Sequence, residues 1–386
     1  MKQIHRLKKD STFNSGRIDV TLLICILSLT AIGLLFVYSA SYYTSLNQTG
    51  SKYHYFFKQL IGAVAGVVLM FIVMRINLSF LRKLALPLLI LSLILLALVF
   101  VPFIGVEKYG AKRWIGFGSM TFQPSEIAKF SLVLFCAYYV TREKTDMKKF
   151  LHILPIVGAG GAMCVLIILE PNMSITVCVG LLMLILIFLS GVKIKHFLLL
   201  LTPALLAVPA LIFAEPYRIK RLLAFIDPWA TPKDEGYQLI QSLYALGSGG
   251  WFGVGIFNSR QKYSFLPFAE SDFVFSVIGE ETGLIGCLIV LILYATVIFR
   301  GVRTAINATN RFDALLAGGI TAVIGVQTLI NFCVVTGLIP PTGLPLPFIS
   351  FGGTSLLVFL VASGILLNIS KNKVTPKNSI IKKRIE

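Results

Sequence analysis

The sequence predicts an all-α integral membrane protein with about ten transmembrane helices. Of its 386 residues, 56% are hydrophobic and only 13% are charged, whereas about 25% of the residues in a soluble domain are charged. The apolar residues form repeated runs of roughly 18–25 residues, which is long enough for a helix to cross the hydrocarbon core of a bilayer. Because backbone groups find no water inside that core, helices are expected there.

The expected helices follow the apolar runs in order. They are placed at 18–38, 56–75, 84–103, 124–141, 151–169, 173–190, 197–214, 272–299, 314–336 and 350–369. The first run has no small-residue cleavage pattern behind it, so it is expected to be retained as a helix. Three outer segments are longer than plain connectors, at 104–123, 215–271 and 337–349. The large outer loop 215–271 is rich in aromatic residues and is expected to form short helices on the membrane surface.

Lys and Arg are distributed unevenly between the two sides of this bundle. With the N-terminus in the cytoplasm, 23 of the 35 Lys and Arg lie in cytoplasmic segments, as the positive-inside rule predicts. An even number of helices then places both termini in the cytoplasm. The chain is accordingly divided into a basic cytoplasmic N-terminus (1–17), a polytopic membrane domain (18–370) and a basic cytoplasmic tail (371–386). This sidedness explains the net charge of +18, so anionic membrane lipids are expected partners and nucleic acid is not.

Cysteine and histidine are placed in ways that disfavour metal chemistry. The six cysteines fall inside apolar runs and the four histidines are scattered. Neither set has the spacing of a zinc site or a disulfide framework. No metal site built on these residues is predicted. No nucleotide-binding motif is evident either, so neither ATP nor a nucleotide sugar is expected.

Two groups of cations lie on the outer side, where the sorting rule disfavours them. Lys112, Arg113 and Trp114 suit either an anchor to anionic headgroups or a site for a phosphorylated substrate. Arg218, Lys220 and Arg221 suit an anionic ligand or a surface loop paired with nearby acids. Arginine can hold phosphate oxygens through two parallel hydrogen bonds, which favours a phosphate-containing ligand.

Glu126 and Lys129 are ionisable residues inside an apolar run. Such residues need a partner or a task at membrane depth. Because they are three positions apart on a helix, they share one face and can neutralise each other. Two interpretations remain open: an ion pair that locks helices together, or a polar wall of a substrate cavity.

The segment 268–281 brings four carboxylates to the outer end of a helix. Asp272 suits the first turn of that helix, where a short acceptor can cap free N–H groups and an anion interacts well with the helix dipole. An ionised carboxylate beside two cationic groups also suits a general base. The two roles are compatible. Glu280 and Glu281 lie deeper and are expected to support the structure or to line a cavity.

Broken backbone near the last helix indicates a cavity. Prolines and glycines interrupt the helical pattern between 337 and 355, and irregular backbone at membrane depth is tolerated where it is buried or lines a cavity. The residues taken as cavity-lining here are Asn331, Ser350, Gly352, Gly353 and Thr354. The run GSGGWFGVG at 247–255 resembles a phosphate-binding loop but lacks the strand and helix that such a loop requires, which indicates a flexible turn.

At these residues the sequence resembles the SEDS family, the shape, elongation, division and sporulation proteins of bacterial cell-wall synthesis. The resemblance covers about 18–370. Its blocks, in family order, are KRWI at 112–115, QPSEIAK at 123–129, GYQLIQSLYALGSGG at 236–250, SDFVFSVIGEE at 271–281 and SFGGTS at 350–355. DPW at 227–229 resembles the division and sporulation branches more than the elongation branch. One departure is EPNMS at 170–174, where many members have Pro-Asp-x-Gly-Thr, so Asn172 is given no catalytic role.

The resemblance implies a peptidoglycan glycosyltransferase that polymerises lipid II at the outer face of the bacterial cytoplasmic membrane, for septal wall synthesis in cell division. Lipid II is a disaccharide-pentapeptide on polyprenyl pyrophosphate. The resemblance implies that Asp272 is the catalytic base. The substrate-binding candidates are Lys112, Arg113, Trp114, Glu126, Lys129, Arg218, Arg221, Gln241, Ser242, Asn331, Ser350, Gly352, Gly353 and Thr354.

The resemblance also implies partners. A class B penicillin-binding protein transpeptidase and other division proteins are expected, and a divalent cation, Mg²⁺ or Mn²⁺, is the one cofactor left open. Two other functions remain open as well. The same polar cavity would serve a transporter that flips a lipid-linked precursor, and the chain could be a non-enzymatic scaffold for division proteins.

Overall fold

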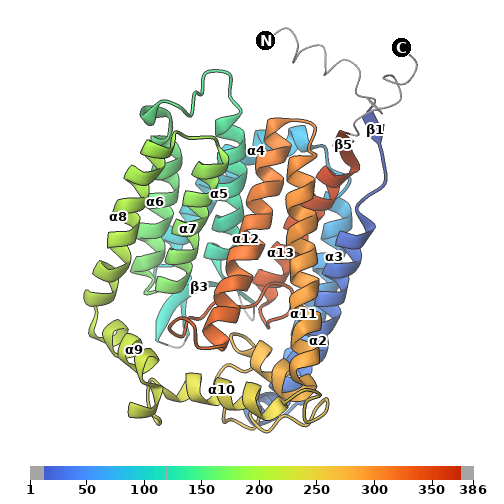
Figure 1. Cartoon of the computed structure of the whole chain (residues 1–386), viewed down its shortest axis with the longest axis vertical. Helices are drawn as coiled ribbons and strands as arrows, with labels where there is room; N and C mark the ends of the chain where they lie inside the picture. Colours follow the sequence, from blue (N-terminus) through green and yellow to red (C-terminus); the bar gives the residue numbers. More distant parts are fainter. Residues whose placement is uncertain (1–12, 109, 118–119, 375–386) are drawn as a thin grey trace, which may run out of the picture.

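The computed structural model describes residues 13–374 except 109 and 118–119, and this part of the chain is mainly helical. Its α-helices are α2 (Val20–Thr49), α3 (His54–Val73), α4 (Leu78–Leu98), α5 (Pro124–Val140), α6 (Leu154–Leu169), α7 (Met173–Leu189), α8 (Ile194–Phe213), α9 (Pro216–Ile226), α10 (Tyr237–Gly249), α11 (Val274–Ile306), α12 (Arg311–Val335) and α13 (Gly353–Lys371). Two short 3₁₀ helices are η1 (Phe150–His152) and η2 (Pro228–Ala230). All the helices except α9, α10, η1 and η2 run along a bundle, and α9 and α10 lie across one end of it (Figure 1).

Length and composition identify the helices that can cross a membrane. Among the described residues, seven helices meet both criteria: α2, α3, α4, α8, α11, α12 and α13. Helices α5, α6 and α7 contain 17, 16 and 17 residues, slightly fewer than the roughly 20 that a span usually needs. The helical integral membrane fold is therefore confirmed. Ten crossings stay a prediction.

Five short strands accompany the helices in the described part of the chain. β2 (Gly105–Lys108), β3 (Ala111–Phe117) and β4 (Met120–Phe122) form an antiparallel sheet in the first outer segment, which sequence analysis did not predict. At the opposite end of the bundle, β1 (Phe13–Ser15) pairs with β5 (Asn372–Val374) (Figure 1). This pairing brings both ends of the described chain to the same end of the bundle, as an even number of crossings requires. The end that carries the sheet, α9 and α10 is called the outer end below.

Helix α12 lies at the centre of the bundle. It contacts α5, α7, α11 and α13, and most of its residues are buried. Helix α8 is the opposite case, because none of its residues is buried. It packs on α7 and otherwise presents apolar side chains to the surroundings, as expected of a helix that faces lipid.

Helix α11 is broken at Gly283, whose backbone is not helical and has a positive φ (φ 66°, ψ −164°). The main chain of the glycine-rich run enters this break. Val254 N–H donates to the carbonyl of Glu280 (2.9 Å), and Leu284 N–H donates to the carbonyl of Gly250 (2.9 Å). The interpretation of this run as a flexible turn is therefore wrong, because its backbone groups bond to those that the broken helix leaves free.

Candidate functional site

Asp272 lies in a turn at the outer end, immediately before α11. Its N–H donates to the carbonyl of Phe268 (3.1 Å), and its side chain is half-buried. The N-cap of α11 is Phe273, without a side-chain hydrogen bond. The expected capping role of Asp272 is therefore wrong, because the residue precedes the cap position. Its carboxylate is not committed to the helix.

Two polar side chains hold this turn against the proline- and glycine-rich segment. Asn331, on α12, donates from Nδ2 to the carbonyls of Asp272 (2.9 Å) and Leu344 (2.8 Å). The Ser350 hydroxyl donates to the carbonyl of Ser271. Both were predicted to contact substrate, and the structure places them beside Asp272, where Asn331 binds the carbonyl of Asp272 and Ser350 binds that of the preceding Ser271. They therefore position the carboxylate.

The same segment forms one wall of the site. A Cβ atom added to Gly343 would lie 3.2 Å from Oδ2 of Asp272. The N–H of Phe351 donates to the carbonyl of Glu270 (2.9 Å). The glycine therefore lets the backbone approach the carboxylate closely, and the hydrogen bond closes the turn on its other side.

The surroundings of Asp272 raise its pKa to about 7. Burial is the main cause and the neighbouring carboxyl of Glu270 adds to it, while the guanidinium groups of Arg221 and Arg113 act in the opposite direction. Burial also raises the pKa of Glu270. A carboxyl group with a pKa near neutrality is suited to accept a proton from a substrate hydroxyl and to release it afterwards.

Arg113 reaches the site from β3. Its Nε donates to the carbonyl of Glu170 (3.2 Å), and its Nη2 donates to that of Pro171. These carbonyls belong to the turn between α6 and α7. Successive side chains on a strand point to opposite faces, so Lys112 and Trp114 lie on the other face of the sheet. Of the three residues, Arg113 is the one whose positive charge lowers the pKa of Asp272.

The two arginines of the predicted cationic cluster on α9 contact different groups. Arg218 donates from Nη1 to the carbonyl of Leu211 (2.7 Å) and so supports the junction between α8 and α9. Arg221 lies over the ring of Tyr217, 4.8 Å from its centroid. Its charge also acts on Asp272. The cluster thus contributes one guanidinium group to the site.

A groove of about 610 Å³ opens beside the site. It lies between α9, the segment before α10, the first turn of α10 and the turn that precedes Asp272. Its lining includes Lys220, Arg221, Asp234, Glu235 and Phe268. Because it shares Arg221 and the Phe268 turn with the Asp272 site, a ligand in the groove would lie next to the candidate base.

Comparison with known proteins identifies the family of this chain. The family model FTSW_RODA_SPOVE, described as a cell cycle protein, matches residues 20–375. The chain belongs to this family. It is 38% identical over 355 residues to stage V sporulation protein E of Bacillus subtilis, covering 92% of this chain and 97% of that protein. It is 39% identical over 373 residues to the probable peptidoglycan glycosyltransferase FtsW of Hahella chejuensis, with 93% and 91% covered.

Solved structures show the same fold. The first carries the description "Structural coordination of polymerization and crosslinking by a peptidoglycan synthase complex". One chain of it matches this protein with a TM-score of 0.74 and 29% identity, over 92% of this chain and 97% of that one. Another is the rod shape determining protein RodA of Thermus thermophilus, with a TM-score of 0.67 and 26% identity over 93% and 98%.

In this FtsW/RodA/SpoVE-family chain, the predicted Glu126–Lys129 pair is buried (Nζ···Oε1 2.9 Å). The Lys129 ammonium also donates to Gln327 (2.5 Å), and the Ser355 hydroxyl donates to Glu126 (3.0 Å). The pair lies within α5 and its further bonds join α5 to α12 and α13, which supports the interpretation as an ion pair that locks helices together. The Gln327 amide donates to the carbonyl of Pro345 (2.8 Å) and so links the pair to the outer segment.

The remaining substrate-binding candidates lie at helix ends and contacts. Ser242 is buried on α10 and bonds both α11 and α12. Gln241 is half-buried on the same helix. Gly353 and Thr354 form the start of α13. Ser242 therefore joins helices. Gln241, Gly353 and Thr354 stay candidates for substrate binding.

Sequence analysis missed Gln59 on α3. Its Nε2 donates to the carbonyl of Ser350 (3.0 Å), and its Oε1 accepts from the N–H of Gly352 (3.2 Å). The side chain is fully buried. The available indication was a Gln at the edge of the apolar part of the helix, because a buried amide has to find partners.

Glu170 was also missed. It is fully buried between α6 and α7, and among the described residues neither carboxylate oxygen has a hydrogen-bond partner. Burial raises its pKa to about 8, against the opposing charge of Arg113. The neighbouring Asn172 caps α7 by accepting from the N–H of Ile175 (3.3 Å).

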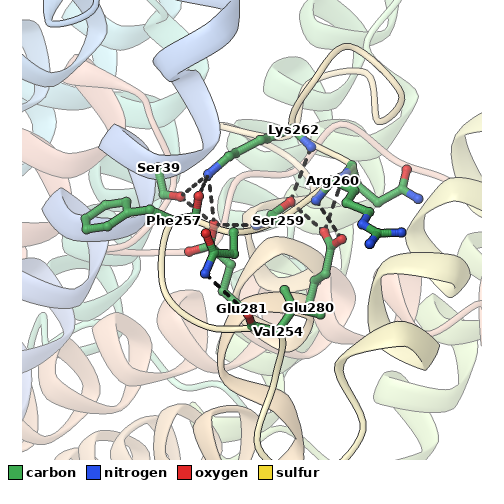
Figure 2. Close-up of polar contacts among 10 residues, drawn as sticks. Ser39, Val254, Phe257, Ser259, Arg260, Lys262, Glu280 and Glu281 are labelled. Atoms are coloured by element: carbon green, nitrogen blue, oxygen red, sulfur yellow. Dashed lines mark hydrogen bonds and ion pairs between the residues drawn. The ribbon is translucent and has the colours of Figure 1, made fainter.

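Glu280 and Glu281 anchor the outer loop, as Figure 2 shows. Glu280 accepts from the Ser259 hydroxyl (2.5 Å). Glu281 accepts from the Ser39 hydroxyl on α2 (2.6 Å) and from the Lys262 ammonium (3.3 Å). The two carboxylates therefore tie the loop that leads to Asp272 to both α11 and α2, which is the supporting role predicted for them.

Proposed function

We propose that this protein is a peptidoglycan glycosyltransferase that polymerises lipid II at the outer face of the bacterial cytoplasmic membrane. The observation that carries the proposal is the half-buried carboxylate of Asp272, held at the outer end beside Arg113 and Arg221. The names of several relatives, probable peptidoglycan glycosyltransferase FtsW, support it.

The site contains the groups that this transfer needs. A hydroxyl of the acceptor sugar attacks the anomeric carbon of the donor, and Asp272 takes the hydroxyl proton as the new C–O bond forms. The bond from the anomeric carbon to the pyrophosphate breaks with inversion. Negative charge then develops on the departing polyprenyl pyrophosphate, where Arg113 and Arg221 stabilise it.

Purified protein incubated with lipid II, with and without a class B penicillin-binding protein, tests this function. We expect glycan strands longer than a single disaccharide on a gel. A chain that moves lipid II across proteoliposome membranes without polymerising it would instead be a transporter. A chain that does neither, although well folded, would be a scaffold.

We propose a class B penicillin-binding protein transpeptidase as partner, together with other division proteins. The similar chain in a peptidoglycan synthase complex supports this. Affinity purification from native membranes should recover such a transpeptidase. Full-rate polymerisation by the chain alone, with no transpeptidase recovered, would contradict the proposal.

We propose that the protein acts at the septum. Its relatives include both a sporulation protein and FtsW proteins at similar identity, 38% and 36%. A fluorescent fusion should concentrate at the division site of growing cells. A fusion seen only at the asymmetric septum of sporulating cells would assign it to sporulation instead.

We propose that any Mg²⁺ or Mn²⁺ in the reaction is brought by the substrate pyrophosphate. Within the described part of the chain, no group of three or more His, Cys, Asp or Glu side chains could hold a metal ion. EDTA should therefore leave the thermal unfolding of the purified protein unchanged. A lower unfolding temperature after chelation would indicate a metal bound by the protein itself.

A further inference from the structure

The groove beside Asp272 has charges of both signs on its walls. Lys220 and Arg221 lie on α9, and Asp234 and Glu235 lie in the segment before α10. The three ion pairs found among the described residues all lie outside this groove. The four charged groups are therefore not paired with one another and stay available to a ligand.

This arrangement favours a ligand that carries charges of both signs. A purely anionic group such as pyrophosphate would be repelled by Asp234 and Glu235, and a purely cationic group would be repelled by Lys220 and Arg221. A ligand with an ammonium group and a carboxylate complements both walls. The aromatic ring of Tyr217 adds apolar surface for aliphatic parts of the same ligand.

The position of the groove restricts the ligand further. Phe268 lines it, and the carbonyl of Phe268 accepts the N–H of Asp272 (3.1 Å). Arg221 belongs to both places. The volume of about 610 Å³ falls within the roughly 300–1,000 Å³ of small-molecule sites. The occupant is therefore a small zwitterionic group that lies next to the reacting sugar.

We propose that this groove binds the peptide attached to the sugar of the substrate, a short peptide with a free side-chain ammonium group and carboxylates. Asp234 and Glu235 bind the ammonium group and Lys220 binds a carboxylate, while Arg221 stays with the pyrophosphate beside Asp272. Peptide binding here orients the disaccharide relative to Asp272. This inference rests on the proposed function, because it concerns the peptide of lipid II.

The test compares two substrates and three proteins. The substrates are lipid II with a free side-chain amine and lipid II in which that amine is acetylated. The proteins are the wild type, the double variant Asp234→Asn/Glu235→Gln, and the control Glu215→Gln. Glu215 is an exposed carboxylate at the start of α9 that does not line the groove. Polymerisation is measured with the partner transpeptidase present.

The double variant should raise KM for native lipid II about tenfold or more, the usual effect of losing hydrogen bonds to a charged group. Its kcat should change much less. Acetylation should raise KM for the wild type by a similar factor, and the double variant should add little to that effect because both changes remove the same interaction. The control should behave as the wild type does with both substrates.

An equal rise in KM for both substrates, or no rise with native lipid II, would overturn the inference. If the double variant does not fold, the wild type with the two substrates still decides, because an unchanged KM after acetylation contradicts the inference. Failure of the proposed function is distinguishable, since the wild type would then polymerise neither substrate.

Discussion

The carboxylate of Asp272 does not cap α11, so changing it to an amide removes a proton acceptor and leaves the fold intact. Asp272→Asn is expected to lower lipid II polymerisation by roughly 100-fold or more, because a positioned base commonly contributes about 10²–10⁴. The matched control is Asp227→Asn, since Asp227 accepts two backbone N–H groups and an amide oxygen can do the same. Near-normal polymerisation by folded Asp272→Asn would move the search to Glu126 or Glu270.

The raised pKa of Asp272 predicts where activity falls in acid. A base must be ionised to accept a proton, so kcat/KM should rise with pH through about 7. Arg113 holds this pKa down, and Arg113→Gln should therefore move the acidic limb of the profile to higher pH. Polymerisation rates between pH 5 and 9 measure the limb. A limb near 4, the ordinary range of an aspartate, would contradict the assignment.

Glu170 predicts how stability depends on pH. Its pKa is about 8 in the folded protein against an ordinary 4.5, so folding favours the protonated form. The stabilising contribution is complete below 4.5 and is lost as the pH rises through about 8. Glu170→Gln stays neutral, so it should unfold at a higher temperature than the wild type at pH 9 and at a similar temperature at pH 5. One kcal/mol corresponds to about 2–4 °C in a large domain.

The control for this comparison is Glu143→Gln, which changes an exposed carboxylate. It should show the pH dependence of the wild type. Thermal unfolding in detergent, followed by intrinsic fluorescence, measures all three proteins. A Glu170→Gln protein with an unchanged pH dependence would show that Glu170 is ionised in the fold.

Sequence reasoning identified the charged residues near the site but not the groups that each of them contacts. Asp272 stood out because ionisable groups are rare in such a chain and it lies at the start of an apolar run, and Arg113 stood out as a cation on the outer side, where the sorting rule disfavours one. Arg218 looked equivalent to Arg221, but the two point to different partners, which depends on the course of α9 and not on residue type. Glu170 escaped notice because its burial follows from the packing of α6, α7 and β3.

At the scale of elements, the break in α11 requires glycine. Gly283 has positive φ, and a Cβ atom there would lie 2.5 Å from the backbone nitrogen of Gly253. Gly283→Ala should destabilise the protein by roughly 1–3 kcal/mol or more, because it adds backbone strain to a steric clash. The control is Gly247→Ala on α10, where an added Cβ has no neighbour within 4 Å among the described residues. Equal unfolding temperatures of the two variants would contradict this view of the break.

Helix positions were predicted more accurately than helix ends. Hydropathy finds the part of a helix inside the membrane, so the expected end at residue 38 missed the polar turns that extend α2 to Thr49. The sheet β2–β4 was missed for a related reason. Its strands are short and lie in a segment without the long apolar runs that guided the analysis, although Gly110 at the turn between β2 and β3 has positive φ (74°).

For the whole molecule, the pairing of β1 with β5 predicts that both ends of the described chain lie on one side of the membrane. We expect that side to be the cytoplasm. After replacement of the native cysteines, Lys233→Cys should react with an impermeant maleimide in intact cells. Lys144→Cys, in the segment between α5 and α6, should react only after the membrane is disrupted. The reverse pattern would invert the topology.

Much of the architecture could be predicted, but the arrangement of the helices could not. Apolar runs indicate how many helices exist because each must cover its backbone in lipid. They do not say which helices touch, since apolar side chains are found on every face. The central place of α12 depends on close contacts such as Gly319, where an added Cβ would lie 2.4 Å from Val133.

The bonds that hold the Asp272 turn to Asn331 and Ser350 have a consequence for chain growth. A carboxylate fixed to the body of the bundle cannot travel with the sugar it has activated. For a lipid II polymerase, each new disaccharide must therefore leave the position beside Asp272 before the next lipid arrives. The glycan must then move past a stationary carboxylate by one disaccharide before each further transfer.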